Sequence, residues 1–321
     1  MHRTRKHAAW LIALTLCLIA TACSTPAPQQ TDDPPPTKAP DSAPAPDNAP
    51  SSAPSSAPTS GPAAADTRAQ QATARLQASE AGKLALRSVN KHGGFEAWFN
   101  GGALAFRYDY RPVKGEAKNS HQTIDLLQAR AYHNLTEPVT GTIAWDGQQA
   151  WSKFDDPQAK FPARFWALTP YYFVAMPFVL GDPGVNLTLI DDNPADVGLP
   201  PSDVLRVTFN PGTGDAPDDY YIVYLAKDDG RMLALRYVVS WKPFVQPQNI
   251  AHTPEKLLVY EDHTQVGPLT MAQKHTTYMM KDGKRGDLVT NTAVSELTYK
   301  APFDASRLTA PQGAVFDRTL E

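Results

Sequence analysis

Short segments with a two-residue hydrophobic period place the strongest constraint on how this chain folds. In residues 103–112, large apolar side chains at every second position (Leu104, Phe106, Tyr108 and Tyr110) alternate with Ala105, Arg107, Asp109 and Arg111, and residues 203–210 and 231–241 also place large apolar side chains at every second position. Such a period puts the two kinds of side chain on opposite faces of a strand. Asp-Gly pairs at 146–147, 229–230 and 282–283 lie between segments of this kind and are typical of tight hairpins.

The pattern predicts about eleven strands and no alternation of strands with helices, so the sheet is expected to be antiparallel. The expected strands lie near 103–112, 121–133, 141–146, 149–154, 185–191, 203–210, 219–227, 231–241, 256–263, 266–280 and 286–300. The fold class is therefore mainly β, of the α+β kind.

Two helical regions accompany the predicted strands. Residues 68–91 are rich in helix formers and end at His92-Gly93-Gly94, a typical helix stop. Residues 158–184 have helical tendency but contain Pro162, Pro170 and Pro177. They predict a kinked pair of short helices inserted between strands, available to cover one face of a curled sheet.

Ten consecutive apolar, aromatic or proline residues, YYFVAMPFVL at 171–180, lie in this insert. The run is too short and too interrupted for a membrane span, which needs about 20 apolar residues. It is either part of the core or the cover of a binding cavity. Aromatic rings supply large, stiff apolar area, and Met176 adapts to varied ligand shapes.

The N-terminus has the features of an export signal. Three basic residues precede the twelve-residue apolar stretch 8–19, and Ala20-Thr21-Ala22-Cys23 follows. This ending resembles the lipobox of bacterial lipoproteins. The resemblance implies cleavage before Cys23, a diacylglycerol thioether on its sulfur and an acyl chain such as palmitate on the new amine. Ser24 implies sorting to the outer membrane. Ordinary secretion with cleavage near Ala22 is the alternative.

Composition limits the partners of the processed chain. The chain has two cysteines, and Cys23 alone follows the predicted signal, so no disulfide is expected. Removing the three basic side chains of residues 1–22 takes the formal charge from −3 to −6. With no basic patch, nucleic acid is not an expected partner.

Residues 23–67 form the predicted link between the lipid anchor and the folded part. They are dominated by Pro, Ala and Ser, a composition that favours a disordered tether with polyproline II character. The expected organisation is thus a signal peptide over 1–22, a lipidated tether over 23–67 and one domain over 68–321.

The domain resembles the LolA/LolB-like lipoprotein-carrier superfamily, and in particular periplasm-facing bacterial lipoproteins within it. The segments that carry the resemblance are 89–110, 166–189 and 218–241. It implies an unclosed half-barrel of about eleven strands, with the helices covering its concave face and a cavity for an acyl-bearing ligand. LolA contacts cargo through an inward arginine, for which Arg107 and Arg111 are the candidates here.

Signals for catalysis are weak. The sequence contains no G-x-S-x-G, H-E-x-x-H or C-x-x-C motif. Its six histidines after residue 91 are dispersed, which does not favour a metal site. The paired aspartates at 155–156, 191–192, 218–219 and 228–229 are expected to cap turns. We therefore expect no catalytic residues, no metal and no cofactor.

The predicted function is that of a membrane-anchored binding protein of the bacterial envelope, facing the periplasm. Its expected partners are the membrane, a hydrophobic molecule such as a lipid or lipoprotein acyl chain, and in one alternative another envelope protein. The candidate ligand-binding residues are Trp98, Phe106, Trp145, Trp151, Phe165, Trp166, Tyr172, Phe173, Met176 and Phe178. The alternatives are a structural or sensing module with a plugged cavity, and an envelope hydrolase assembled from scattered His and Asp.

Overall fold

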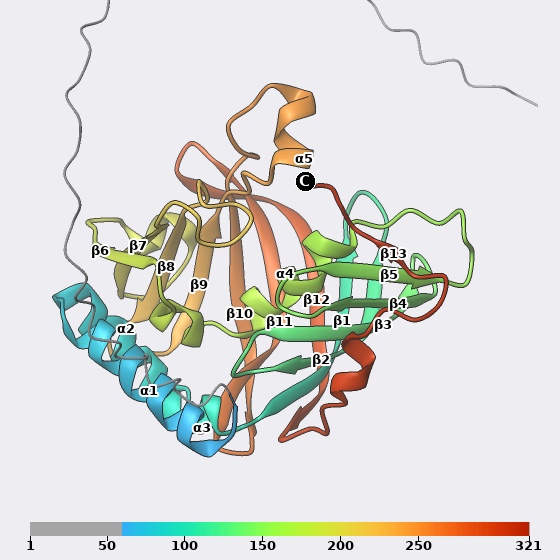
Figure 1. Cartoon of the computed structure of the whole chain (residues 1–321). Helices are drawn as coiled ribbons and strands as arrows, with labels where there is room; N and C mark the ends of the chain where they lie inside the picture. Colours follow the sequence, from blue (N-terminus) through green and yellow to red (C-terminus); the bar gives the residue numbers. More distant parts are fainter. Residues whose placement is uncertain (1–59, 321) are drawn as a thin grey trace, which may run out of the picture. The chain divides into compact units, whose positions relative to one another are not determined.

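Thirteen strands form one continuous sheet in the computed structural model, which describes residues 60–320 (Figure 1). The strands are β1 (Ala103–Pro112), β2 (Lys118–Asp125), β3 (Arg130–Glu137), β4 (Gly141–Trp145), β5 (Ala150–Phe154), β6 (Val185–Leu189), β7 (Ser202–Phe209), β8 (Tyr221–Ala226), β9 (Met232–Tyr237), β10 (Lys256–Val266), β11 (Leu269–Lys281), β12 (Lys284–Tyr299) and β13 (Val315–Phe316). The predicted signal peptide, Cys23 and most of the predicted tether lie outside the described residues.

The sheet is antiparallel throughout and does not close into a barrel. Its strand order is β13-β5-β4-β3-β2-β1-β12-β11-β10-β9-β8-β7-β6, so β13 and β6 are its two edges. Every neighbouring pair in this order is antiparallel. The predicted unclosed antiparallel fold is confirmed.

The expected hairpins are present. Asp282 and Gly283 connect β11 to β12 with φ values of 51° and 75°, the left-handed pair of a two-residue turn. Asp146 caps the turn between β4 and β5, because its Oδ1 accepts hydrogen bonds from the backbone N–H groups of Gln148 and Gln149 at 2.8 and 2.7 Å.

Three details of the strand prediction are wrong. The strand expected over 231–241 ends at Tyr237, the last residue of β9. The single strand expected over 121–133 is the hairpin of β2 and β3. Its turn contains no glycine or proline and is held by Asp125, whose carboxylate accepts from the backbone of Leu127 at 3.0 Å and pairs with Arg130 at 2.6 Å. The two-residue strand β13 is too short to produce a periodic signal.

The helix predicted over 68–91 is two helices, α1 (Pro62–Gln77) and α2 (Glu80–Lys91). Ser79 separates them, because its side chain accepts a hydrogen bond from the backbone N–H of Gly82 and caps α2. Residues 62–67, assigned to the tether from the sequence, belong to α1. The predicted stop is correct: α2 ends at Lys91, and Gly93 has a φ of 122°.

The remaining helices are short. They are α3 (Gly94–Phe99), α4 (Ala163–Val174), α5 (Lys242–Val245) and four 3₁₀ turns, η1 (Phe178–Gly181), η2 (Pro194–Val197), η3 (Gln246–Gln248) and η4 (Ala305–Leu308). Pro170, expected to interrupt the insert, lies inside α4. No helix among residues 60–320 combines the length and hydropathy needed to cross a bilayer.

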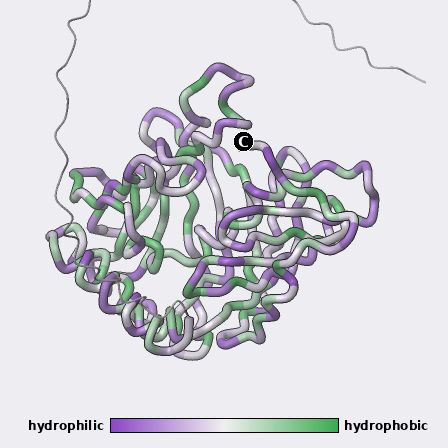
Figure 2. Tube along the Cα trace, viewed as in Figure 1, coloured by the Kyte–Doolittle hydropathy of each residue, from purple (hydrophilic) through white to green (hydrophobic). Residues whose placement is uncertain are grey.

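The main core lies between the inner face of the sheet and helices α1 to α4 (Figure 1). Helix α4 contacts β3, β4 and β5, and η1 contacts α1, α2 and α3. Two smaller clusters cover the outer face. One lies between η2 and strands β7 to β10, and the other lies between β3 to β5 and the C-terminal segment. Figure 2 shows hydrophobic residues spread along strands and helices rather than gathered in one element.

A candidate apolar binding pocket

A cavity of about 200 Å³ lies between α4 and one half of the sheet. Helix α4 supplies Phe165, Leu168, Tyr172 and Phe173. The opposite wall comes from the end of β7, from β8 and β9 and from the segment that follows β9. The complete lining is Trp145, Arg164, Phe165, Leu168, Thr169, Tyr172, Phe173, Phe209, Thr213, Gly214, Asp215, Ala216, Asp219, Tyr221, Tyr237, Val238, Val239 and Trp241.

Aromatic rings meet in pairs around this cavity. The ring centroids of Phe165 and Trp241 are 4.9 Å apart, those of Phe173 and Tyr237 are 5.1 Å apart, and those of Phe209 and Tyr221 are 5.4 Å apart. These distances lie in the range of favourable ring contacts. The first two pairs join α4 to the sheet side, so the two walls contact each other through aromatic rings and form a largely apolar surface.

Position along the strands explains which rings reach the cavity. Tyr221 and Tyr237 are directly opposite each other in the pairing of β8 with β9. Val223 and Leu235, two residues further along each strand on the same face, belong to the main core. The pocket is thus the open end of the main core.

Asp219 is the more buried of the two acidic residues that line the pocket. Its Oδ1 accepts hydrogen bonds from the backbone N–H of Ser240 at 2.5 Å and from the Ser240 hydroxyl at 2.7 Å. Burial raises the pKa of the Asp219 carboxyl to about 6, and the bonds from Ser240 act in the opposite direction. At neutral pH the pocket therefore contains a carboxylate in apolar surroundings.

Arg164 lies at the rim and is paired. Its Nε and Nη2 donate to the two carboxylate oxygens of Asp215 at 2.7 and 2.9 Å, and its guanidinium lies 4.8 Å from the ring centroid of Trp145. Its backbone N–H donates to Asp317 at 2.8 Å. This arrangement ties the start of α4 both to the 213–216 loop and to the C-terminal segment.

The tyrosines of the pocket remain neutral. Burial raises the pKa of Tyr172, Tyr221 and Tyr237 above the ordinary value of a phenol. Their hydroxyls form no hydrogen bond with another described residue, so they are available to a polar group of a ligand.

Four of the ten candidate ligand-binding residues line this pocket: Trp145, Phe165, Tyr172 and Phe173. Five others are packed in the main core: Trp98, Phe106, Trp166, Met176 and Phe178. Trp98 and Phe178 stack with centroids 4.2 Å apart and are each 1% exposed. The apolar run at 171–180 is therefore divided between the pocket and the core.

Trp151 lies on the other face of the sheet. It pairs with Ala144 in the register of β4 and β5, whereas Trp145 pairs with Ala150, so the two tryptophans point to opposite faces. The indole N–H of Trp151 donates to the Leu308 carbonyl at 2.7 Å, beneath the C-terminal segment. The structure does not bring Trp151 to the pocket.

Several lining residues were not among the candidates, notably Phe209, Tyr221, Tyr237 and Trp241. The alternation over 231–241 placed Tyr237 and Trp241 on one face in the sequence. The aromatic residues on that face are the signal for this wall. Of the tyrosines at 220–224, Tyr221 lines the pocket, whereas Tyr220 and Tyr224 belong to the cluster on the outer face.

The two candidate arginines lie on the outer face of β1. Arg107 donates to Asn119 Oδ1 at 3.0 Å, and Arg111 pairs with Asp109 at 2.7 Å and with Glu137 at 2.8 Å. The core face of this strand carries Phe106 and Tyr108 instead. Neither arginine points toward the pocket.

The predicted turn-capping role is correct for some of the paired aspartates. Asp156 and Asp229 accept hydrogen bonds from backbone N–H groups two residues further along the chain. Asp192 instead pairs with Arg236 at 2.7 Å on the outer face, and Asp219 binds Ser240. Within residues 60–320 no group of three or more acidic, His or Cys side chains could hold a metal ion.

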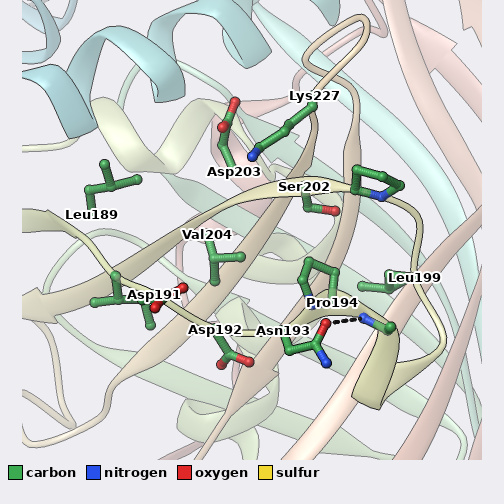
Figure 3. Close-up of a pocket in the computed structure, with 13 residues that line it drawn as sticks. Leu189, Asp191, Asp192, Asn193, Pro194, Leu199, Ser202, Asp203, Val204 and Lys227 are labelled. Carbon is green, nitrogen blue, oxygen red and sulfur yellow. Dashed lines mark hydrogen bonds between the residues drawn. The ribbon is translucent and has the colours of Figure 1, made fainter.

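A larger and more polar cavity, of about 650 Å³, lies at the β6–β7 connection (Figure 3). Its lining includes Asp191, Asp192, Asp203 and Lys227, and Leu189 at its margin is 53% exposed. No aromatic residue contributes to it. The smaller aromatic pocket is therefore the better candidate for an apolar ligand.

No family model matches the chain, and no curated protein matches it. Among solved structures, it is similar to a LolA superfamily protein from Nitrosomonas europaea, with a TM-score of 0.47 and 11% identity over 72% of this chain and 98% of the other. A DUF1329 family protein from Desulfovibrio piger gives a TM-score of 0.46 and 10% identity over 71% and 95%. A domain described as that of an outer membrane lipoprotein-sorting protein, from Vibrio parahaemolyticus, gives 0.44 and 10% over 70% and 94%. One of these solved structures is thus described with the superfamily name that the sequence resemblance gave.

Proposed function

We propose that this chain is a non-catalytic binding protein of the bacterial envelope, which holds a hydrophobic molecule between α4 and strands β7 to β9. The observation that carries the proposal is the aromatic pocket itself. Its paired rings supply apolar contact area, and its few polar groups, Asp219 and the tyrosine hydroxyls, can orient a ligand.

The size of the pocket limits what it holds in this conformation. Its volume of about 200 Å³ is below the roughly 300–1,000 Å³ of most small-molecule sites. A lipid or a lipoprotein acyl chain would need additional room. Helix α4 is the element that could provide it, because it forms one whole wall and is fixed at its start by Arg164.

The anchoring part of the proposal rests on the sequence. We propose that Cys23 carries the lipid anchor and that the following Pro/Ala/Ser-rich segment connects it to the domain, with the outer membrane as the site of attachment. A chain that begins at residue 24 keeps every contact described here, so ligand binding can be tested without the anchor.

Native mass spectrometry of such a chain, exported to the periplasm and purified without detergent, tests the proposal. We expect extra mass that disappears on denaturation and that extraction identifies as an apolar molecule. Phe173→Asp is expected to remove it, because a carboxylate in the aromatic wall has no partner there. Leu189→Asp, in the polar cavity of Figure 3, is the matched control and should keep the bound mass.

A mass equal to that of the bare chain, unchanged after incubation with envelope lipids, would contradict the proposal. The aromatic run would then have a structural role only, and the alternative of a sensing module with a protein partner would become the better account.

A further inference from the structure

The chemistry of the pocket distinguishes it from a simple slot for an acyl chain. In this conformation, the cavity of about 200 Å³ admits a compact group, and a long chain would need the additional room that α4 could provide. Its walls are aromatic on both sides, from Phe165, Tyr172 and Phe173 on α4 to Tyr221, Tyr237 and Trp241 on the sheet side. Rings arranged in this way attract a positive charge placed within about 6 Å of their faces.

One cationic side chain lies beside a wall of the pocket. The Lys256 ammonium lies 5.9 Å from the ring centroid of Tyr237. Lys256 is opposite Tyr237 in the pairing of β10 with β9 and is not itself part of the pocket lining. Tyr237 thus already makes a cation–π contact with a side chain outside the pocket lining.

Asp219 supplies the complementary charge. Its Oδ1 is held by Ser240, whereas Oδ2 accepts no hydrogen bond from another described residue. The second acidic lining residue, Asp215, is bound by Arg164 through both carboxylate oxygens. Because Arg164 and Asp215 neutralise each other in this ion pair, Asp219 is the remaining charged residue of the lining.

We propose that the pocket binds a quaternary ammonium group, such as the trimethylammonium of choline, between its aromatic walls and beside Asp219. This inference rests on the proposed function, because it specifies the ligand of the same pocket. A quaternary group donates no hydrogen bonds, which suits a lining with few acceptors and many rings. The group could belong to free choline or to the head group of a choline lipid.

Choline and its neutral isostere 3,3-dimethylbutan-1-ol have nearly the same shape and differ in charge. Comparing their affinities therefore isolates the contribution of the positive charge. Isothermal titration of the chain from residue 24 with each probe is expected to give at least tenfold tighter binding of choline. Asp219→Asn keeps the size of the side chain and an Oδ1 that accepts from Ser240, and it should remove most of that tenfold preference. Asp218→Asn is the matched control, since Asp218 is exposed and does not line the pocket, and should keep the preference.

A second pair of variants tests the rings without touching the carboxylate. Tyr237→Phe removes the hydroxyl but keeps the aromatic face, so it should retain the preference for choline over the isostere. Tyr237→Leu should weaken choline by several-fold while changing the binding of the isostere little. Thermal unfolding of each variant shows whether it is folded before its titration is interpreted.

The outcomes separate this inference from the proposed function. Equal binding of choline and the isostere would overturn the ammonium inference and leave the apolar pocket intact. Binding of a fatty acid alone would do the same. Binding of none of these probes would overturn both. Lysophosphatidylcholine that binds more tightly than choline identifies a lipid head group as the source, and equal affinities identify a free small molecule.

Discussion

Lowering the pH from 7 to 4.5 is expected to reduce the free energy of unfolding by several kcal/mol, through three histidines in the core. His92, His133 and His275 are at most 2% exposed. Burial lowers the pKa of His92 to about 4 and those of His133 and His275 to about 3. In the unfolded chain these rings titrate near 6.5.

The direction of the effect follows from proton binding. Because the native pKa values are depressed, the unfolded state binds more protons below about pH 6.5, and stability falls as the pH falls from there toward 4 and then 3. A difference of one pKa unit corresponds to about 1.4 kcal/mol, so each histidine removes roughly 2–3 kcal/mol at pH 4.5. The sum is a large part of the roughly 5–15 kcal/mol that stabilises a typical domain.

The contacts of these histidines explain why they resist protonation. The Nδ1 of His92 lies 2.8 Å from the carbonyl oxygen of Thr270, and its Nε2 accepts a hydrogen bond from the backbone N–H of Met232 at 3.1 Å. Only a neutral ring can make both bonds. His275 lies between the rings of Tyr108 and Tyr260, with centroids 6.2 and 5.0 Å away, and its Nδ1 has no hydrogen-bond partner among residues 60–320.

Asp219 acts in the opposite direction. Its pKa of about 6 is raised above the ordinary value of a carboxyl, so the native state binds its proton more readily and gains stability as the pH falls from about 6 toward 4. One carboxyl offsets part of the loss from three histidines and does not reverse it.

Urea unfolding at pH 7 and pH 4.5 measures the effect. His133→Leu should flatten the pH dependence by about 2 kcal/mol. His121→Leu is the control, because His121 is an exposed side chain that pairs with Glu296 at 3.3 Å. An unfolding free energy equal at the two pH values would show that the buried histidines do not control acid stability.

The second large effect divides the aromatic run into two parts. Phe178→Ala is expected to cost about 3–5 kcal/mol, because it empties a fully buried site stacked on Trp98. Phe173→Ala is expected to cost about 1 kcal/mol, since its ring is half-buried at the pocket and loses one aromatic contact. The effects on ligand binding should have the opposite order, with Phe173→Ala weakening binding more than Phe178→Ala.

Urea unfolding and ligand titration of both variants provide the comparison. A folded Phe178→Ala protein should still bind the ligand, and Phe173→Ala should bind it at least tenfold more weakly. Equal stability losses for the two substitutions would mean that the run is one structural unit and that the pocket is part of the core.

Local patterns predicted much of the sheet. The alternation over 103–112 matches β1 residue for residue, and the Asp-Gly pair at 282–283 forms the expected turn. The β2–β3 hairpin was missed because its turn depends on the Asp125 side chain and a positive φ at Ala129, neither of which has a composition signal. Ser79 likewise interrupts a run of good helix formers with a single cap.

The pocket was less predictable than the sheet. An aromatic residue on a strand or helix can face a cavity, the core or the outer face, and the register of distant strands decides between them. Trp145 and Trp151 illustrate this. In the β4–β5 pairing they lie opposite Ala150 and Ala144, so Trp145 faces the pocket and Trp151 lies beneath the C-terminal segment. Asp219 was expected to cap a turn, and its position in the pocket depends on the contact with Ser240.

Photolabelling with a diazirine-bearing fatty acid tests most directly whether the ligand lies between α4 and the sheet. After irradiation and digestion of the labelled chain, we expect modified peptides from residues 164–173 and 209–241, and a loss of that labelling in Phe173→Asp. Labelling confined to residues 189–204, around the polar cavity of Figure 3, would contradict the proposed binding site.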